Sequence, residues 1–157
     1  MTPDRRAIPM NARERWGLLL IDEDPDRLIA YPLLTARAAR SGGVTLGRYF
    51  TEADAMAQSQ LAAHEAFGAE GISLFSDVGI LAEAMGSRFH HGDNEGPSLD
   101  DPVLGETDDP SARPAPSARL GRLPVVTEAA ALCHRAVGDT VPVFGFVPGP
   151  FTTAAML

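Results

Sequence analysis

The last seventeen residues, 141–157 (VPVFGFVPGPFTTAAML), constrain the possible folds of this chain most strongly. They combine a short apolar run rich in Val and Phe, a Pro/Gly loop, and the first turn of a helix. Such a run is typical of a strand that is buried on both faces of a parallel sheet. In α/β barrels the active site lies on the loops that join such strands to the following helices. We therefore expect functional residues in this loop, in a strand–loop–helix unit that is still open at Leu157.

Strand and helix patterns alternate along the rest of the chain, after a loose leader at residues 1–10. The expected elements are a helix opened by a capping box of Asn11 and Glu14, a strand at 27–32, a helix at 52–67 capped by Thr51 with Asp54 and ended by Gly68, a strand at 71–77, a helix at 80–85, a helix from Pro124 to Gly138 and the final strand at 141–147.

This order indicates βαβ units around a parallel sheet. Right-handed crossovers make an arc of a barrel or a doubly wound sheet the natural candidates. About three strands are expected, which are too few to close an eight-stranded barrel. Residues 87–120 interrupt the pattern with a Pro-rich stretch that carries seven acidic residues between Asp93 and Asp109 and no basic residue among them. We expect an exposed excursion there, with a lid as a candidate role, because long loops in compact domains tend to be functional or mobile.

Composition excludes several classes of function. The net charge of −8 argues against nucleic acid or an anionic membrane as a partner. All thirteen basic residues are Arg, so a Schiff base or a phosphate-loop Lys is excluded within this sequence. Cys133 is the single cysteine, so there is no disulfide within the chain. With no signal-peptide pattern and no apolar run long enough to span a membrane, we expect a soluble cytoplasmic protein.

Asp77 is the first candidate for chemistry, because it ends an apolar strand where barrel side chains reach the pocket. A partly desolvated carboxylate there would suit N–H donors or a developing cation. The alternative is a cap for the helix that follows. In the loop at 148–152, Gly149 permits close backbone approach to a ligand, and the next helix offers N–H groups to an anion. An ordinary rigid turn capped by Thr152 explains the same pattern.

The histidines and the cysteine are weak signals. His90 and His91 are adjacent, and surface positions explain them better than a metal site does. Cys133 and His134 lie about 100° apart on their helix, which suggests a buried thiol and a surface imidazole rather than a dyad. We predict no metal site in this chain.

Several segments together resemble the uroporphyrinogen decarboxylase superfamily. Residues 71–77 (GISLFSD) and 82–86 (AEAMG) are similar to its FSD…ALG segment, and residues 145–152 (GFVPGPFT) to its GFxGxPFT loop. Residues 24–27 (DPDR) resemble the DRxP opening of its methyltransferase members, and 121–124 (GRLP) fits as well. The matches are collinear and span nearly the whole chain.

The resemblance implies the N-terminal half of a (β/α)8 barrel and two alternative activities. The family's decarboxylases remove acetate carboxyls from a tetrapyrrole without a cofactor, and the residue that matches Asp77 contacts the pyrrole N–H groups. Its methyltransferases move a methyl group between a corrinoid cobalt and a thiolate held by zinc. By this resemblance Asp77 is the expected catalytic residue, and the expected substrate-binding residues are Phe75, Ser76, Gly149, Pro150, Phe151 and Thr152.

Two departures from the family pattern bear on the choice. The decarboxylases carry an MRQAGRY segment that clamps substrate carboxylates, whereas this chain reads LLTARAAR after Pro32, so that Arg37 and Arg40 are the candidates for carboxylate binding. The zinc ligands of the methyltransferases, a His-x-Cys pair and a later Cys, are absent from this sequence.

We expect part of a methyltransferase, with zinc and a corrinoid supplied through the missing half. The expected partners are a tetrapyrrole or a corrinoid-protein substrate, and a second half-barrel chain or another copy. A decarboxylase of porphyrin synthesis is the first alternative. A non-catalytic chain, either truncated or a tetrapyrrole-binding or half-barrel subunit, is the second.

Overall fold

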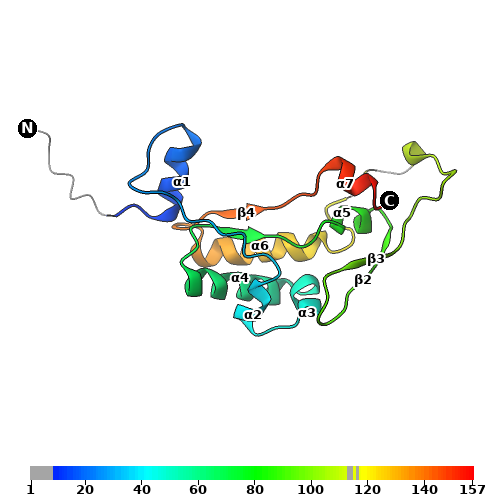
Figure 1. Ribbon diagram of the computed structural model, residues 1–157, viewed down its shortest axis with the longest axis horizontal. Coiled ribbons are helices and arrows are strands. Elements are labelled where there is room, and N and C mark those ends of the chain that lie inside the picture. The colour runs from blue at the N-terminus through cyan, green and yellow to red at the C-terminus, as the bar shows by residue number, and fades with distance from the viewer. Residues whose placement is uncertain (1–8, 113–114, 116) are drawn as a thin grey trace, which may run out of the picture.

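A computed structural model describes residues 9–112, 115 and 117–157, and its centre is a two-stranded parallel sheet. Strand β1 (Ile72–Leu74) pairs with β4 (Val143–Gly145), with Ile72 opposite Val143 and Leu74 opposite Gly145. The two long helices α4 (Ala53–Phe67) and α6 (Leu123–Val137) lie on one side of the strands (Figure 1). This is the βαβ arrangement expected from the sequence, and it places the carboxyl ends of both strands at the end of the molecule that carries α5 (Ile80–Ala84) and α7 (Pro150–Ala154).

The hydrophobic core lies between the sheet and these two helices. Alternate residues of β1, Ile72 and Leu74, are almost fully buried against it, together with Met56 of α4 and Cys133 of α6. Because side chains alternate across a strand, Ser73 and Phe75 project from the opposite face of the sheet. That second face has no long helix on it (Figure 1).

Several expected helices are confirmed. The capping box of Asn11 and Glu14 opens α1 (Ala12–Leu20), with the Glu14 N–H donating to Asn11 Oδ1 at 2.9 Å. Gly68 ends α4 in the left-handed conformation (φ 63°), as a C-terminal cap requires. Helix α5 and helix α6 follow their predicted ranges within two residues.

The cap predicted for α4 is wrong, because Thr51 belongs to an additional helix. Thr51 is the last residue of α3 (Leu46–Thr51), and its hydroxyl donates to the Gly47 carbonyl instead of capping α4. Glu52 is the N-cap residue of α4, without a side-chain cap bond. A further short helix, α2 (Ala38–Gly42), packs against α4. No element was predicted for its Ala-rich stretch.

The strand predicted at 27–32 is also wrong, so the described sheet that holds the core has two parallel strands rather than three. One backbone bond joins the segment to the residues before β1, from the Glu70 N–H to the Ala30 carbonyl (2.8 Å), and the other bonds involve side chains. The Ala30 N–H donates to the Glu70 carboxylate (2.8 Å), and the Tyr31 hydroxyl lies 2.5 Å from Ser73 Oγ. The two observed strands are shorter than predicted, and β4 is half-buried rather than buried on both faces.

The acidic excursion contains structure that the sequence did not predict. Strands β2 (Arg88–His90) and β3 (Ser98–Asp101) form an antiparallel hairpin, and Pro110–Ala112 form the 3-10 helix η1. The expected exposure is confirmed for β3, whose four residues are all exposed. Backbone bonds hold the excursion to the body, because Leu46 N–H donates to the Asp93 carbonyl (2.9 Å) and Leu104 N–H to the Leu157 carbonyl (2.5 Å). Within the described residues, no helix has the length and apolar character of a membrane span.

Candidate functional site

The carboxyl ends of β1 and β4 lie side by side and present aromatic side chains on the face of the sheet opposite α4 and α6, which Trp16 of α1 and Tyr31 partly cover. The rings of Phe75 and Phe146 meet edge to face with centroids 4.6 Å apart. Tyr31 and Phe144 lie further along the same face, 5.0 Å apart. We call the cavity between them the inner-face pocket. It has a volume of about 150 Å³ and is lined by Tyr31, Leu33, Thr35, Ser73, Phe75, Phe144, Gly145 and Phe146, none of which carries a charge.

Asp77 lies just beyond β1 and is largely buried, with 8% of the residue exposed. Its Oδ1 accepts a hydrogen bond from the Gly79 N–H (2.9 Å), directly before α5, and its Oδ2 accepts one from the Ser76 hydroxyl (2.9 Å). Helix α5 has Gly79 as its N-cap residue and no side-chain cap bond, so the helix cap anticipated as an alternative role is not formed, and the Gly79 bond closes a local turn instead. The bonds from Gly79 and Ser76 leave acceptor positions of the Asp77 carboxylate free, because its two oxygens offer about four.

Arg122, the residue before α6, is the principal charged neighbour of Asp77. Its Nη2 lies 2.7 Å from Asp77 Oδ2 and 2.6 Å from Glu83 Oε2, while its Nε donates to the same Glu83 oxygen at 2.7 Å. Its Nη1 donates to Ser76 Oγ (3.0 Å) and to the Phe50 carbonyl (3.4 Å). We call Ser76, Asp77, Glu83 and Arg122 the Arg122 cluster. One guanidinium thus faces two carboxylates in a setting where all three groups are shielded from water.

The two contacts of Arg122 Nη2 are ion pairs by distance but not aligned hydrogen bonds. Nη2 has no acceptor along its N–H directions, although two carboxylate oxygens lie within 2.7 Å. Distance alone still gives a strong Coulomb attraction where water is excluded. The attraction to Asp77 is therefore mainly electrostatic, whereas Glu83 is also held by the bond from Nε.

The 148–152 loop begins α7 at the end of β4. Gly149 is the N-cap residue, and a Cβ added there would meet no atom within 4 Å, so the backbone at this position is open to approach. Phe151 is 89% exposed. Thr152 is not the cap that one interpretation required, because α7 has no side-chain cap bond. Helix α7 packs against α5, although no hydrogen bond or ion pair joins Asp77 to residues 148–152 within the described chain.

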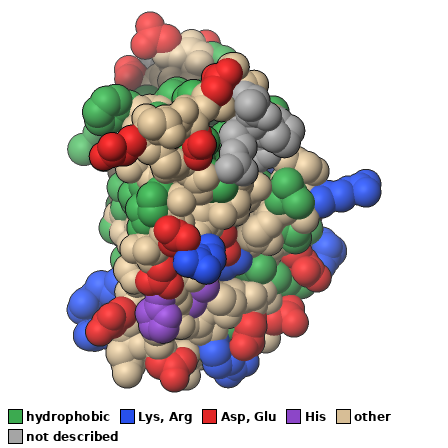
Figure 2. Space-filling view, turned by 90° about the vertical axis from the view of Figure 1, so that its right-hand side faces the viewer, with side chains coloured by type: hydrophobic (Ala, Val, Ile, Leu, Met, Phe, Trp, Pro, Cys, Tyr) green, Lys and Arg blue, Asp and Glu red, His purple; other side chains and the backbone are tan. Residues whose placement is uncertain are grey.

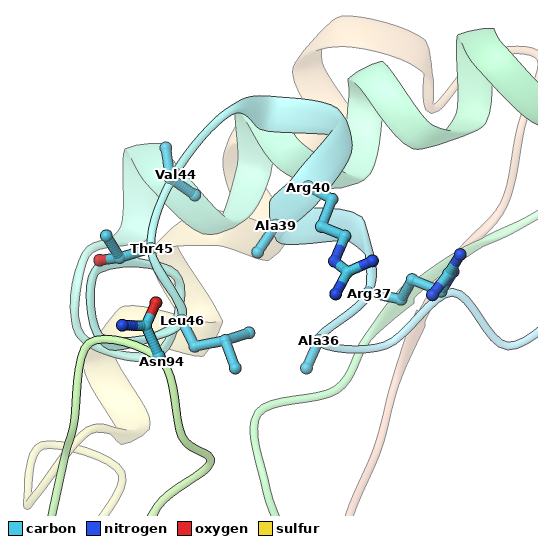
Figure 3. A pocket seen from close by; sticks show the side chains of 8 residues that line it. All are labelled: Ala36, Arg37, Ala39, Arg40, Val44, Thr45, Leu46 and Asn94. Atoms are coloured by element: carbon cyan, nitrogen blue, oxygen red, sulfur yellow. The ribbon is translucent and has the colours of Figure 1, made fainter.

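Arg37 and Arg40 line a different cavity from the inner-face pocket. This cavity of about 450 Å³ lies between α2, the turn before α3 and Asn94 of the excursion. Figure 3 shows the Arg40 side chain turned toward Ala36 and Leu46, while Arg37 points away from them. Both arginines are exposed and neither has an ion pair in the described structure. The structure therefore does not bring the predicted carboxylate-binding residues together with Asp77.

The end of the molecule at which the strands finish carries scattered acidic side chains and a few histidines (Figure 2). His91 lies 3.6 Å from Glu83 Oε1, and its Nδ1 is buried without a hydrogen-bond partner. In the part of the chain that the structure describes, no three His, Cys, Asp or Glu side chains are grouped to hold a metal. Cys133 is completely buried, and this burial raises the pKa of its thiol to about 11. His134 beside it is exposed.

A second buried charge cluster lies at the opposite end of β1 from Asp77. Glu70 accepts bonds from Arg15 Nη1 and Arg27 Nη1, both at 2.7 Å, and Arg15 also pairs with Asp26 (2.6 Å). Burial alone would raise the pKa of Glu70, but the Ala30 N–H and the two arginines outweigh it, so the pKa lies below its usual value. The DPDR segment therefore stabilises the fold through this charge cluster, at the opposite end of β1 from the candidate site.

Arg122 lies in the segment 121–124 that resembles the family, but the sequence alone assigned it no role. Sequence reasoning also missed Glu83, which lies one turn along α5 from Asp77. The sequence signal for the pair is an Arg in a Gly-Arg-Leu-Pro turn, directly before an apolar helix that packs on the sheet. The inner-face aromatic residues Tyr31 and Phe144 were assigned only to strands, because their partners across the sheet are not visible in sequence.

The comparisons with known proteins agree with this geometry. The family model for uroporphyrinogen decarboxylase (URO-D) matches residues 13–157, and the chain belongs to this family. It is 40% identical over 91 residues to a uroporphyrinogen decarboxylase of Myxococcus xanthus (strain DK1622), covering 57% of this chain and 25% of that protein. It is 33% identical over 108 residues to the methylcobamide:CoM methyltransferase MtaA of Methanosarcina barkeri, covering 68% of this chain and 32% of that protein.

The fold comparison identifies the architecture. A solved methyltransferase from Methanosarcina mazei matches with a TM-score of 0.82 and 28% identity, over 94% of this chain and 45% of that one. The chain is thus part of a TIM-type (β/α)8 barrel, as the sequence predicted. The matched segments span a quarter to a third of the length of these curated relatives.

Proposed function

We propose that this chain supplies one wall of a barrel that transfers a methyl group from a methylcobamide to a thiol. The name of the Methanosarcina barkeri relative describes this reaction, and the solved methyltransferase shares the fold over nearly the whole chain. The chain's own contribution would be made at the carboxyl ends of β1 and β4, where barrel enzymes place their active sites.

The observation that carries this proposal is the uncharged, aromatic inner-face pocket. Phe75 and Phe146 offer ring faces and edges to a broad, flat macrocycle, which such side chains bind by packing. A decarboxylase substrate carries several carboxylates and needs basic side chains beside its ring. The two unpaired arginines, Arg37 and Arg40, line the other cavity instead.

The predicted site residues at the strand ends have separate roles in this proposal, in which Arg37 and Arg40 take no part. The carboxylate of Asp77 accepts an N–H donor such as the amides at the edge of a corrin ring, because charged acceptors make the stronger hydrogen bonds. Gly149 permits the backbone to approach the ligand, and the exposed Phe151 covers its apolar surface. Pro150 begins α7 and Thr152 lies in its first turn, while the Ser76 hydroxyl donates to Asp77 and orients it.

Zinc, which the family's methyltransferases use to hold a thiolate, does not fit the residues described in this chain. Zinc sites take Cys, His or carboxylate ligands at tetrahedral positions. Cys133 is sealed between α4 and α6, with its Sγ against the Ala57 carbonyl at 3.8 Å. We therefore assign no zinc ligand and no step through zinc to this chain.

Decarboxylation of a tetrapyrrole is the second candidate function. It is favoured by Asp77 itself, whose partly free carboxylate at a strand end suits pyrrole N–H groups, and by the 40% identity to a decarboxylase. In this reaction Arg37 and Arg40 would have to meet substrate carboxylates at the edge of the site.

A non-catalytic role is the third candidate. The face of the sheet opposite α4 and α6 is covered only in part, by Trp16 and Tyr31, and Phe146, Val147 and Phe151 are exposed at its end, so a second half-barrel chain or another copy could complete it. This role predicts a stable oligomer without turnover of either substrate.

The test compares turnover of two substrates by the gene product as it is expressed. Loss of methyl from methylcobalamin in the presence of coenzyme M is followed by absorbance, and loss of carboxyl groups from uroporphyrinogen by chromatography of the oxidised porphyrins. The proposal predicts the first activity and its loss in Asp77→Ala. Decarboxylation without demethylation would replace it with the second candidate. No turnover, together with an oligomer in light scattering, would replace it with the third.

A further inference from the structure

The Arg122 cluster has a geometry that links Asp77 to three separate elements of the fold. Arg122 stands at the start of α6, Glu83 lies on α5, and Asp77 ends the segment after β1. The Phe50 carbonyl, which also accepts from Arg122, belongs to α3. A single side chain therefore connects the segment bearing Asp77 to the helices behind it.

The charges explain why this link bears on Asp77 in particular. Asp77 and Glu83 are two carboxylates that share one guanidinium, and with Arg122 removed they would face each other across a buried space as like charges. The remaining aligned bonds of Asp77 come from Ser76 and from the Gly79 N–H, both within two residues in sequence. Both bonds lie within one turn, so they respond to a reorientation of the carboxylate but do not fix that turn against the rest of the protein.

We infer that Arg122 is a positioning residue that holds the Asp77 carboxylate at the end of β1, leaving part of Oδ1 to receive an N–H donor from the ligand. The inference rests on the proposed role of Asp77 and holds for either macrocyclic substrate. Arg122 itself faces away from solvent, with 6% of the residue exposed, and it lines none of the three cavities that contain a predicted binding residue. It therefore acts through Asp77 rather than on the ligand.

The Gly79 amide reports the position of Asp77 without any activity. Its N–H donates to Asp77 Oδ1 at 2.9 Å. When the carboxylate moves, this bond weakens and the amide exchanges faster with solvent. Arg15 provides a matched control, because it is equally buried and also pairs with two carboxylates, but lies at the other end of β1.

The experiment combines hydrogen exchange with a double-mutant cycle in the expressed gene product. Arg122→Gln is expected to speed exchange at Gly79 and to lower kcat/KM for methylcobalamin with coenzyme M by between about 10- and 100-fold, the range that misplaced catalytic groups produce. The double variant with Asp77→Ala is expected to be no less active than Asp77→Ala alone, since the two residues act as one unit. Arg122→Lys keeps the positive charge but lacks the planar guanidinium group, so it is expected to lose less of kcat/KM than Arg122→Gln.

Arg15→Gln is expected to lower Tm while leaving both Gly79 exchange and kcat/KM unchanged. Where Arg122→Gln does not fold, Arg122→Lys carries the same comparison with a smaller effect. The inference is overturned if Gly79 exchange is unaffected by either Arg122 variant, or if the losses of Arg122→Gln and Asp77→Ala multiply. A normal Gly79 response together with full activity of Asp77→Ala would instead refute the catalytic role of Asp77 and leave Arg122 as the residue that holds it.

Discussion

Gly42, the last residue of α2, allows this helix to cross α4 at close range. A Cβ added at Gly42 would lie 2.3 Å from Ser59 Oγ and 2.8 Å from Ser59 Cα. The hydroxyl can rotate, but the Cα belongs to the backbone of α4, and Ser59 is completely buried. Gly42→Ala therefore has to push two packed helices apart.

The size of this effect follows from two opposing terms. Overpacking a close contact costs about 1–3 kcal/mol. Replacing a helical Gly with Ala returns about 0.5–1 kcal/mol of backbone entropy. We expect a net loss of about 1–2 kcal/mol, which for a domain of this size lowers Tm by about 2–8 °C.

Gly17 is the matched control, because it lies inside α1 and a Cβ there would meet nothing within 4 Å. Gly17→Ala is expected to raise Tm by about 1–4 °C, since only the entropy term remains. Thermal unfolding followed by circular dichroism measures both variants. The packing account is refuted if Gly42→Ala raises Tm as Gly17→Ala does.

Two further predictions concern buried ionisable groups. The fold lowers the pKa of Glu70 below its usual value of 4.5, so the ionised carboxylate stabilises the folded state fully above pH 4.5. This stabilisation is lost as the pH falls through the pKa that Glu70 has in the folded protein. The Tm difference between wild type and Glu70→Gln should therefore shrink between pH 7 and pH 3. A difference that stays constant over this range would show that the carboxylate charge is not what holds the cluster. The Cys133 thiol, fully buried and with its pKa raised to about 11, should react with Ellman's reagent at pH 8 only after denaturant is added, and rapid labelling of the native protein would contradict the described α4–α6 contact.

The elements with strong local signals were predictable from sequence. Asn11 and Glu14 satisfy each other's backbone N–H groups, and Gly68 adopts the left-handed conformation that few other residues accept. These features depend only on residues a few positions away, so the local sequence is enough to predict them. The same holds for α6, whose apolar residues recur at helical spacing and pack on the sheet.

Other features depended on distant partners and were missed. Residues 27–32 have the composition of a strand, but Ala30 and Tyr31 bond to Glu70 and Ser73 side chains instead of joining a ladder. Thr51 has the spacing of a cap, yet α3 continues through it. For the candidate site, Asp77 and the 148–152 loop were chosen from their place after strands, whereas the pairing of Asp77 with Arg122 joins residues 45 positions apart in sequence and needed the fold.

The separation of the two cavities decides how the family resemblance applies here. The inner-face pocket contains the aromatic residues at the strand ends, and the other cavity contains Arg37 and Arg40. A ligand that is recognised by ring packing and one that is recognised by its carboxylates would therefore occupy different parts of this chain. The backbone amides that a ligand protects from hydrogen exchange, its footprint, would therefore differ between these two kinds of ligand.

Hydrogen exchange of the gene product with and without methylcobalamin measures this footprint most directly. The account predicts slower exchange at residues 77–79 and 145–152, with no change at residues 36–46, which border the Arg37 and Arg40 cavity. Slower exchange confined to residues 36–46, with 145–152 unchanged, would contradict the assignment of the strand ends as the ligand-binding site.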